Sequence, residues 1–152
     1  RAELTGTEKV SDAYCGTGTI GLCAAGKAGS VLGIELNPDA VRDAGVNAKL
    51  NDIRNARFLA GDATEVMENL AREGETAGVI LMDPPRSGST PRFLEAAAGM
   101  KPRSIVYVSC NPETLARDLG ILRKLGYNAK GIRPFDMFPF TPHVETVVLL
   151  TK

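Results

Sequence analysis

The sequence predicts an α/β fold in which a doubly wound, mostly parallel sheet carries helices on both faces. Short apolar, β-branched runs alternate with helical patterns along the chain, for example 104–108 followed by 111–126, and this alternation is typical of parallel sheets. The glycine-rich run 16–21, of the form Gly-x-Gly-x-x-Gly, lies between an expected strand and an expected helix. That is the context in which such a run forms a ligand-binding turn.

Helices are expected where a capping residue precedes apolar residues at helical spacing. Asn37, Thr90 and Asn111 are each followed by proline, and proline is well tolerated at the first helical position. The fourth strand is the most apolar and is therefore expected at the centre of the sheet. The expected strands are 9–15, 31–36, 56–62, 78–83, 104–108, 128–133 and 144–151. The expected loops are 84–89 and 134–143. Five helices are expected in chain order: one that ends near 29, one that begins at 37, one that spans 63–73, one that ends near 99 and one that ends at 126.

Length and composition indicate one globular domain. The chain has 152 residues, 43% apolar and 24% charged, and no window approaches the ~18 apolar residues of a membrane span. Its three cysteines form no Cys-x-x-Cys pair, which argues against disulfides and thiolate metal sites. We expect a cytoplasmic, monomeric domain, 1–152, without a metal and excised from a longer protein. The 18 basic residues balance 18 acidic ones, so a nucleic-acid partner requires a local patch or another domain.

Acidic residues end several expected strands at the edge where open α/β sheets bind ligands. Glu35 ends the second strand, Asp62 the third and Asp83 the fourth. Beside the turn formed by Gly16 and Gly18, the Glu35 carboxylate is suited to accept both hydroxyls of a ribose. A dinucleotide and S-adenosylmethionine both fit this pattern. The acidic rim favours S-adenosylmethionine, because a sulfonium cofactor carries no phosphates. Taken singly, each acid is equally well explained as a turn former.

Cys110 lies at the carboxyl end of an expected strand, directly before a helix start. The positive end of a helix favours the thiolate, which is the nucleophilic form of cysteine. A lone cysteine is more often a small buried apolar residue, and Cys15 and Cys23 are interpreted in that way. The neighbours of Cys110 favour a nucleophile instead.

Those neighbours belong to a set of motifs that resembles the RNA (uracil-5-)-methyltransferase family, whose members make 5-methyluridine in ribosomal and transfer RNA. The motifs occur in order and cover nearly the whole chain. They are Asp12-Ala13-Tyr14-Cys15-Gly16-Thr17-Gly18, Asp83-Pro84-Pro85-Arg86-Ser87-Gly88, Tyr107-Val108-Ser109-Cys110-Asn111-Pro112 with Ala116-Arg117-Asp118-Leu119, and Asp136-Met137-Phe138-Pro139 through His143-Val144-Glu145-Thr146. The resemblance implies a Rossmann-like, S-adenosylmethionine-dependent methyltransferase fold. It also implies amino-terminal RNA-binding and central domains outside this chain.

The resemblance implies roles for individual residues. Cys110 is expected to be the nucleophile and Glu145 the general base. His143, the only histidine, is a competing base that ranks second. The positions that match cofactor-contacting residues of the family, together with the glycines of the turn, are Tyr14, Gly16, Gly18, Thr19, Glu35, Asp62 and Asp83.

Basic and aromatic residues near these motifs are candidates for binding an RNA substrate. Arg86, Arg117 and Arg133 are suited to hold phosphates or uracil carbonyls, although a surface ion pair explains Arg117 equally well. An extruded base requires a stacking partner, and the candidates are Phe135, Phe138 and Phe140. Core packing is the alternative for each phenylalanine.

Two other functions stay open on the sequence. The loop 83–85, Asp-Pro-Pro, also resembles loops that serve methylation of an exocyclic base amine, in which case Cys110 is structural. A catalytically silent module that binds the cofactor or a partner domain is the other alternative. In the preferred function, the RNA partner is ribosomal or transfer RNA bound by the full-length protein.

Overall fold

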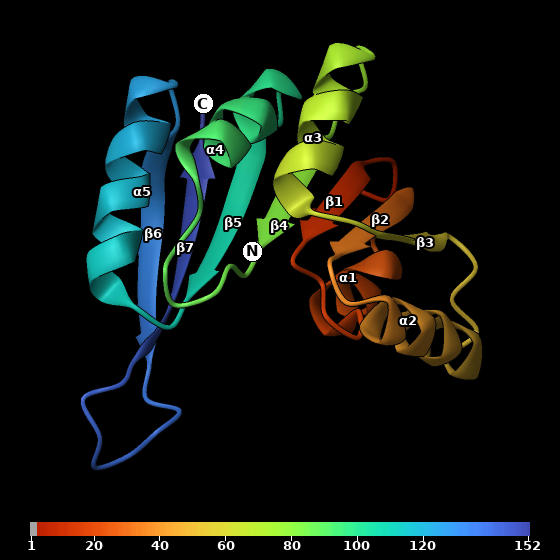
Figure 1. Cartoon of the computed structure of the whole chain (residues 1–152), viewed down its shortest axis with the longest axis horizontal. Coiled ribbons are helices and arrows are strands. Elements are labelled where there is room, and N and C mark those ends of the chain that lie inside the picture. Colours follow the sequence, from red (N-terminus) through yellow and green to blue (C-terminus); the bar gives the residue numbers. More distant parts are fainter. Residues whose placement is uncertain (1–2) are drawn as a thin grey trace.

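The computed structural model describes residues 3–152, and its strands and helices alternate as the sequence predicts (Figure 1). The strands are β1 Lys9–Ala13, β2 Ser30–Glu35, β3 Ala56–Ala60, β4 Val79–Met82, β5 Ser104–Ser109, β6 Asn128–Phe135 and β7 Glu145–Thr151. The helices are α1 Thr19–Ala25, α2 Pro38–Leu50, α3 Ala63–Arg72, α4 Pro91–Gly99 and α5 Pro112–Lys124. Asn37, Thr90 and Asn111 cap helices as expected, each accepting a backbone N–H through its side chain.

The strands form one seven-stranded sheet in the order β3-β2-β1-β4-β5-β7-β6. Strands β1 to β5 pair in parallel, whereas β7 lies antiparallel between β5 and β6. From β1 the chain moves outward through β2 and β3 on one side and through β4 and β5 on the other. A topological switch point therefore lies between β1 and β4, and ligands bind outside the carboxyl ends of strands at such a point.

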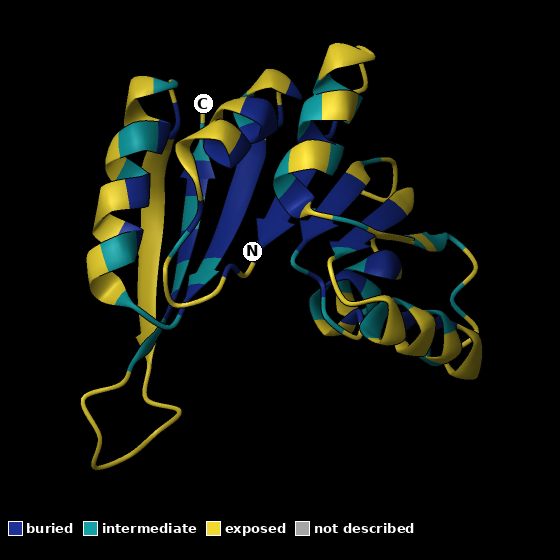
Figure 2. Cartoon of the chain, viewed as in Figure 1, coloured by how far each residue is buried: buried dark blue, intermediate teal, exposed yellow. Residues whose placement is uncertain are grey.

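Helices cover both faces of this sheet (Figure 1). Helices α3, α4 and α5 pack on one face over a core that includes Met67, Phe93 and Leu122, each fully buried. Helix α1 covers the other face near β1 and β2, where Ala25 and Val31 are buried. The central strands are accordingly buried along most of their length (Figure 2). Burial of each large apolar side chain contributes about 1.5–3 kcal/mol, so the sheet is a rigid platform for its carboxyl edge.

Three strand ends differ from the sequence prediction by two residues. β1 stops at Ala13 rather than at Cys15. β3 stops at Ala60 rather than continuing to Asp62, because Asp62 caps α3 and accepts the Thr64 and Glu65 N–H groups at 2.9 and 3.1 Å. Aspartate is among the best N-cap residues, and the cap requires the chain to leave the strand first. β6 continues through Pro134 to Phe135, which is possible because it is an edge strand, where a missing N–H breaks no ladder.

The interpretation of Cys23 as a buried packing residue is wrong, whereas Cys15 is buried as expected. Helix α1 buries Gly21 and Ala25, and residues two positions away lie on the opposite side of a helix. Cys23 is therefore turned to the surface.

The carboxyl-terminal hairpin is the most exposed part of the sheet. All residues of β6 are exposed, and the segment 136–144 between β6 and β7, here called the hairpin tip, extends away from the sheet (Figures 1 and 2). Lys130, Pro134 and a register shift at Ala129/Gly131 interrupt the outer edge. Such features protect an edge strand from pairing with another chain. Across residues 3–152, no helix has the length and apolar character needed to cross a membrane.

Candidate functional site

The candidate cofactor and catalytic residues lie at the same edge of the sheet. Tyr14 follows β1, Glu35 ends β2, Asp83 follows β4 and Cys110 follows β5. Glu145 begins β7, and because β7 runs antiparallel to β5, its first residue lies beside the end of β5. The edge that open α/β sheets use for ligands therefore carries each of these side chains.

The glycine turn leaves room for a ligand at one glycine and packs tightly at another. Gly16 and Gly18 have positive φ angles of 54° and 86°, a region that favours glycine. A Cβ built on Gly16 meets nothing within 4 Å, whereas one on Gly18 lies 3.1 Å from the Phe58 ring. The backbone at Gly16 is therefore open to close approach by a ligand, whereas Gly18 packs the turn against the sheet. Thr19 is the first residue of α1 and adjoins this turn.

Tyr14 is held in an unusual backbone conformation beside this turn. Its φ is 62°, which is rare for an aromatic residue and is found where surrounding contacts impose it. Those contacts are a tilted ring packing on Phe93, with centroids 5.2 Å apart, and a 3.1 Å hydrogen bond between the hydroxyl groups of Tyr14 and Ser89. Burial raises the pKa of Tyr14, so its hydroxyl stays protonated.

The Glu35 carboxylate is oriented by the backbone on both of its oxygens. The Gly16 N–H donates to Oε2 at 3.0 Å and the Asn37 N–H donates to Oε1 at 2.9 Å. Each carboxylate oxygen has a second lone pair, so both oxygens are still able to accept a ligand hydroxyl. Asp62 reaches the same edge as the cap of α3. The open backbone at Gly16 and this carboxylate fit an adenosine ribose, as expected for S-adenosylmethionine.

Asp12 is a site residue that sequence analysis did not assign. It is 1% exposed, and its Oδ2 accepts the Gly21 N–H at 2.8 Å, which ties the glycine turn to β1. Its Oδ1 is buried without a hydrogen-bond partner among the described residues. Burial, helped by the negative charge of Asp83, raises the pKa of Asp12 to about 7. An acidic residue inside an expected strand was the available sequence signal.

We expect Asp12 to make the protein less stable as pH rises from about 4 to about 7. Over that range the unfolded carboxyl loses its proton while the folded one keeps it, so the free energy of unfolding should fall by about 1.4 kcal/mol per pH unit. Asp12→Asn retains an acceptor for Gly21 and should flatten this slope. Urea denaturation at several pH values measures it, and parallel profiles for the two proteins would contradict the assignment.

Cys110 and Glu145 lie at the same end of the β5–β7 ladder. Ser109 and Thr146 form the last pair of that ladder; Cys110 directly follows Ser109, and Glu145 directly precedes Thr146. Cys110 is a free, partly exposed thiol. Burial and the negative charge of Glu145 raise the pKa of Asp83, which places the Glu145 carboxylate within electrostatic range of the Asp83 loop.

The segment 84–89, here called the proline loop, is fastened to the turn that carries Cys110. The Arg86 carbonyl accepts hydrogen bonds from the Asn111 side-chain amide at 3.0 Å and from the Thr114 hydroxyl at 3.2 Å. The Arg86 guanidinium reaches Nδ1 of His143 at 3.2 Å. The loop therefore bridges the start of α5 and the hairpin tip.

The phenylalanines expected to stack on a base are exposed. Phe135, Phe138 and Phe140 are exposed, Phe140 completely, so core packing is wrong for all of them. Phe138 packs edge-on against the His143 ring, with centroids 6.4 Å apart. Arg133 is also exposed, on β6. Arg117, by contrast, donates to carbonyls of the proline loop; RNA binding by any of these residues stays a prediction.

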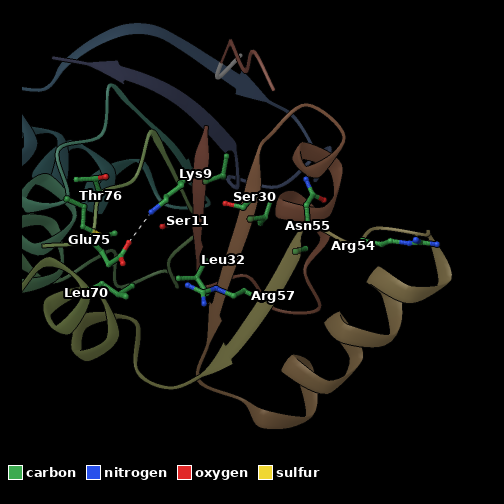
Figure 3. Close-up of a pocket in the computed structure, with 14 residues that line it drawn as sticks. Lys9, Ser11, Ser30, Leu32, Arg54, Asn55, Arg57, Leu70, Glu75 and Thr76 are labelled. Carbon is green, nitrogen blue, oxygen red and sulfur yellow. Dashed lines mark hydrogen bonds and ion pairs between the residues drawn. The ribbon is translucent and has the colours of Figure 1, made fainter. Parts of the chain in front are cut away.

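A separate cavity of about 370 Å³ lies at the opposite edge of the sheet (Figure 3). Its lining includes the first residues of strands β1, β2 and β3, namely Lys9, Ser30 and Ala56. Lys9 forms an ion pair with Glu75 at 3.3 Å. Since parallel strands point their amino ends away from the glycine turn, this cavity is not part of the candidate site. Among residues 3–152, no group of histidine, cysteine and acidic side chains is arranged to hold a metal ion.

Comparison with solved structures finds the same architecture. The tRNA (uracil-54, C5)-methyltransferase of Pyrococcus abyssi, solved in complex with S-adenosyl-L-homocysteine, superposes with a TM-score of 0.85 and 39% identity over 99% of this chain and 36% of that chain. A precorrin-8W decarboxylase of Methanobacterium thermoautotrophicum shares the fold, with a TM-score of 0.77 at 21% identity over 99% of this chain and 84% of that chain.

Sequence comparison covers nearly the whole chain. An uncharacterized RNA methyltransferase of Listeria innocua is 51% identical over 99% of this chain and 33% of its own length. One of Clostridium acetobutylicum is 48% identical over the same shares. The chain thus spans about a third of the length of the curated relatives that it matches. The model of the tRNA (Uracil-5-)-methyltransferase family matches residues 3–152, and the chain therefore belongs to that family.

Proposed function

We propose that the protein containing this domain is an S-adenosylmethionine-dependent methyltransferase that methylates C5 of a uridine in ribosomal or transfer RNA through a covalent adduct of Cys110 with C6. The observation that carries this proposal is the register of β5 and β7, in which Ser109 pairs with Thr146, the immediate neighbours of Cys110 and Glu145. A nucleophile and a base on facing strands suit a reaction in which one adds to the ring and the other removes a proton from it.

In this proposal the cofactor binds at the carboxyl edge of the sheet, between the glycine turn and Asp83. The Glu35 carboxylate accepts the ribose hydroxyls, Gly16 allows close approach of the backbone, and Asp62 lies toward the adenine. S-adenosylmethionine supplies an electrophilic methyl group on a sulfonium. The acidic residues at this edge stabilise that positive charge, and Tyr14 lies on the side nearest the proline loop.

Cys110 starts the chemistry by adding its thiolate to C6 of uracil. The electron pair of the C5–C6 double bond moves toward the C4 carbonyl and gives an enolate, which makes C5 nucleophilic. C5 then takes up the methyl group as the sulfur–methyl bond of the sulfonium breaks, which leaves a neutral thioether. Glu145 removes the C5 proton, the enolate re-forms, and its collapse restores the double bond and expels the thiolate. Covalent catalysis thus divides one difficult substitution into easier steps.

The target base must leave its helix before it reaches Cys110, because the C6 atom is inaccessible in a stacked helix. Phe138 and Phe140 on the exposed hairpin tip are suited to stack on the extruded base or its neighbour, an interaction that contributes about 1–3 kcal/mol per base. Arg86 belongs to the proline loop, and its guanidinium reaches His143; it is suited to bind a phosphate or a uracil carbonyl.

Glu35→Ala should weaken binding of S-adenosylmethionine. Loss of charge-assisted hydrogen bonds to a ribose costs about 1.5–3 kcal/mol, or roughly tenfold to a hundredfold in the dissociation constant. Asp39→Ala is the matched control, because Asp39 is an acid in the first turn of α2 whose ion pair is with the exposed Arg42. Calorimetric titration compares the two, and equal affinities would remove Glu35 from the cofactor site.

Two measurements on the full-length protein test the proposed function. Mass analysis of RNA nucleosides after reaction should find 5-methyluridine, and RNA containing 5-fluorouridine should form a denaturant-stable complex, because the fluorine cannot leave as a proton does. Methylation of an exocyclic amine needs no adduct and would leave the fluorinated RNA free. Cofactor binding without transfer to any RNA would instead favour a silent module.

A further inference from the structure

A fully buried carboxylate lies behind the proline loop and has no part in the proposed chemistry. Asp118 on α5 is 0% exposed, yet both of its oxygens are hydrogen-bonded. Oδ2 accepts the Ser89 N–H and the Tyr107 hydroxyl, each at 2.7 Å, and Oδ1 accepts the Arg117 Nε–H at 2.9 Å. Burial of a charge is costly unless it is paired and fully hydrogen-bonded. The three donors around Asp118 compensate for its burial.

Arg117 extends the same contact along the proline loop. Its guanidinium donates to the carbonyls of Ser87 and Ser89, both at 3.0 Å, while it pairs with Asp118. The planar, multi-donor guanidinium is suited to such simultaneous contacts, which a lysine cannot reproduce. Together the two neighbours on α5 hold the loop by a backbone N–H and by two backbone carbonyls.

Gly88 permits this close contact. Its φ is +74°, and a Cβ at this position would lie 2.6 Å from the Arg117 guanidinium and 2.7 Å from Asp118 Oδ2. Both distances are below any that a real side chain tolerates. The loop backbone therefore lies directly against the Arg117–Asp118 pair.

Ser89 connects this pair to the cofactor side of the site. Its N–H donates to Asp118, and its hydroxyl is hydrogen-bonded to the Tyr14 hydroxyl at 3.1 Å. Tyr14 has the strained backbone conformation next to the glycine turn. A continuous set of contacts thus runs from α5, the helix that follows Cys110, through the proline loop to the cofactor turn.

We propose that Arg117 and Asp118 are a positioning pair that fixes the proline loop relative to Cys110, and that Ser89 relays this position to Tyr14. The inference rests on the proposed function. Neither Asp118 nor Ser89 needs to touch RNA, because Asp118 is fully buried and Ser89 is 4% exposed. Their effect is exerted through geometry, since a displacement of about 1 Å in a reacting group lowers rates by about a hundredfold.

The first test compares variants of the full-length protein in adduct formation with 5-fluorouridine RNA, at saturating RNA and cofactor. Asp118→Asn and Arg117→Met should each lower the maximal rate by about tenfold or more. Both should also weaken binding of S-adenosylmethionine, because Ser89 relays the position of the loop to Tyr14. Ser89→Ala breaks only that relay, so it should weaken cofactor binding with a maximal rate close to that of the unmodified protein. Arg92→Met is the control, because it breaks an exposed Arg–Glu pair with Glu68 at 2.6 Å and should change neither quantity.

The second test does not depend on activity. The Ser89 amide is protected by a buried acceptor, so hydrogen exchange at 86–89 should be at least about tenfold faster in Asp118→Asn and Arg117→Met than in Arg92→Met. Faster exchange with an unchanged adduct rate would overturn positioning and leave a purely structural pair. Unchanged exchange at 86–89 in both variants would show that Arg117 and Asp118 do not hold the loop. If Asp118→Asn does not fold, Arg117→Met and Ser89→Ala still test the proposal. If the unmodified protein forms no adduct with any RNA, the proposed function fails and positioning for it fails too, while the exchange result still decides whether the pair holds the loop.

Discussion

Cys110→Ala should abolish both methyl transfer to RNA and the covalent RNA–protein complex. Without a thiolate to add at C6, no enolate forms and C5 stays a poor nucleophile, so activity of the full-length protein should fall by several orders of magnitude. A denaturing gel with labelled cofactor and 5-fluorouridine RNA reports both losses at once. Cofactor affinity should be preserved, because Cys110 follows β5 while the glycine turn follows β1.

Cys23→Ala is the matched control for this experiment. Cys23 is an exposed thiol on α1, a helix that is not part of the turn that carries Cys110. Its loss should leave the adduct intact. Residual methylation by Cys110→Ala, with no adduct formed by the unmodified protein, would instead favour transfer to an exocyclic amine and make Cys110 structural.

Glu145→Gln should have a different defect, in which the reaction starts but does not finish. The base acts on an intermediate that exists only after the thiolate has added, so attack and methyl transfer should still take place while elimination stalls. Ordinary uridine RNA should then remain bound to the protein, with the methyl group attached. Incubation with methyl-labelled cofactor, followed by a denaturing gel, should show a labelled RNA–protein band that the unmodified protein does not accumulate.

His143→Gln is the comparison that separates the two candidate bases. His143 lies on the hairpin tip and is engaged by the Arg86 guanidinium, whereas Glu145 begins the strand that faces Cys110. His143→Gln should therefore weaken RNA binding without trapping an adduct. A folded Glu145→Gln protein that forms no labelled band, together with a trapped His143→Gln complex, would give the role of base to His143.

Much of this architecture was predictable because it depends on local signals. The caps at Asn37, Thr90 and Asn111 are determined within a few residues, and the alternation of strands and helices predicts a parallel sheet. The placement of Glu35 and Cys110 at one edge follows from the rule that parallel strands share a direction. These features require no knowledge of which strands are neighbours.

The remaining features depend on contacts between distant segments. The hydrogen bonds of Asp118 reach Ser89, 29 positions away, and nothing in the local sequence around Arg117 indicates that its partners are loop carbonyls. For Asp62, a strand end and a helix cap differ only in where the chain turns, and the local sequence does not determine that position. The antiparallel insertion of β7 beside β5, which brings Glu145 to the carboxyl end of β5, is likewise a property of the whole sheet.

The antiparallel placement of β7 makes the position of Glu145 independent of the length of the hairpin tip. The position of Glu145 is set by pairing with β5 on one side and β6 on the other, and not by the length of the chain that precedes it. Residues can be gained or lost within 136–144 without shifting that register, because the tip extends free of the sheet. Relatives in this family are thus able to differ in the length and sequence of the tip while Glu145 stays beside the end of β5.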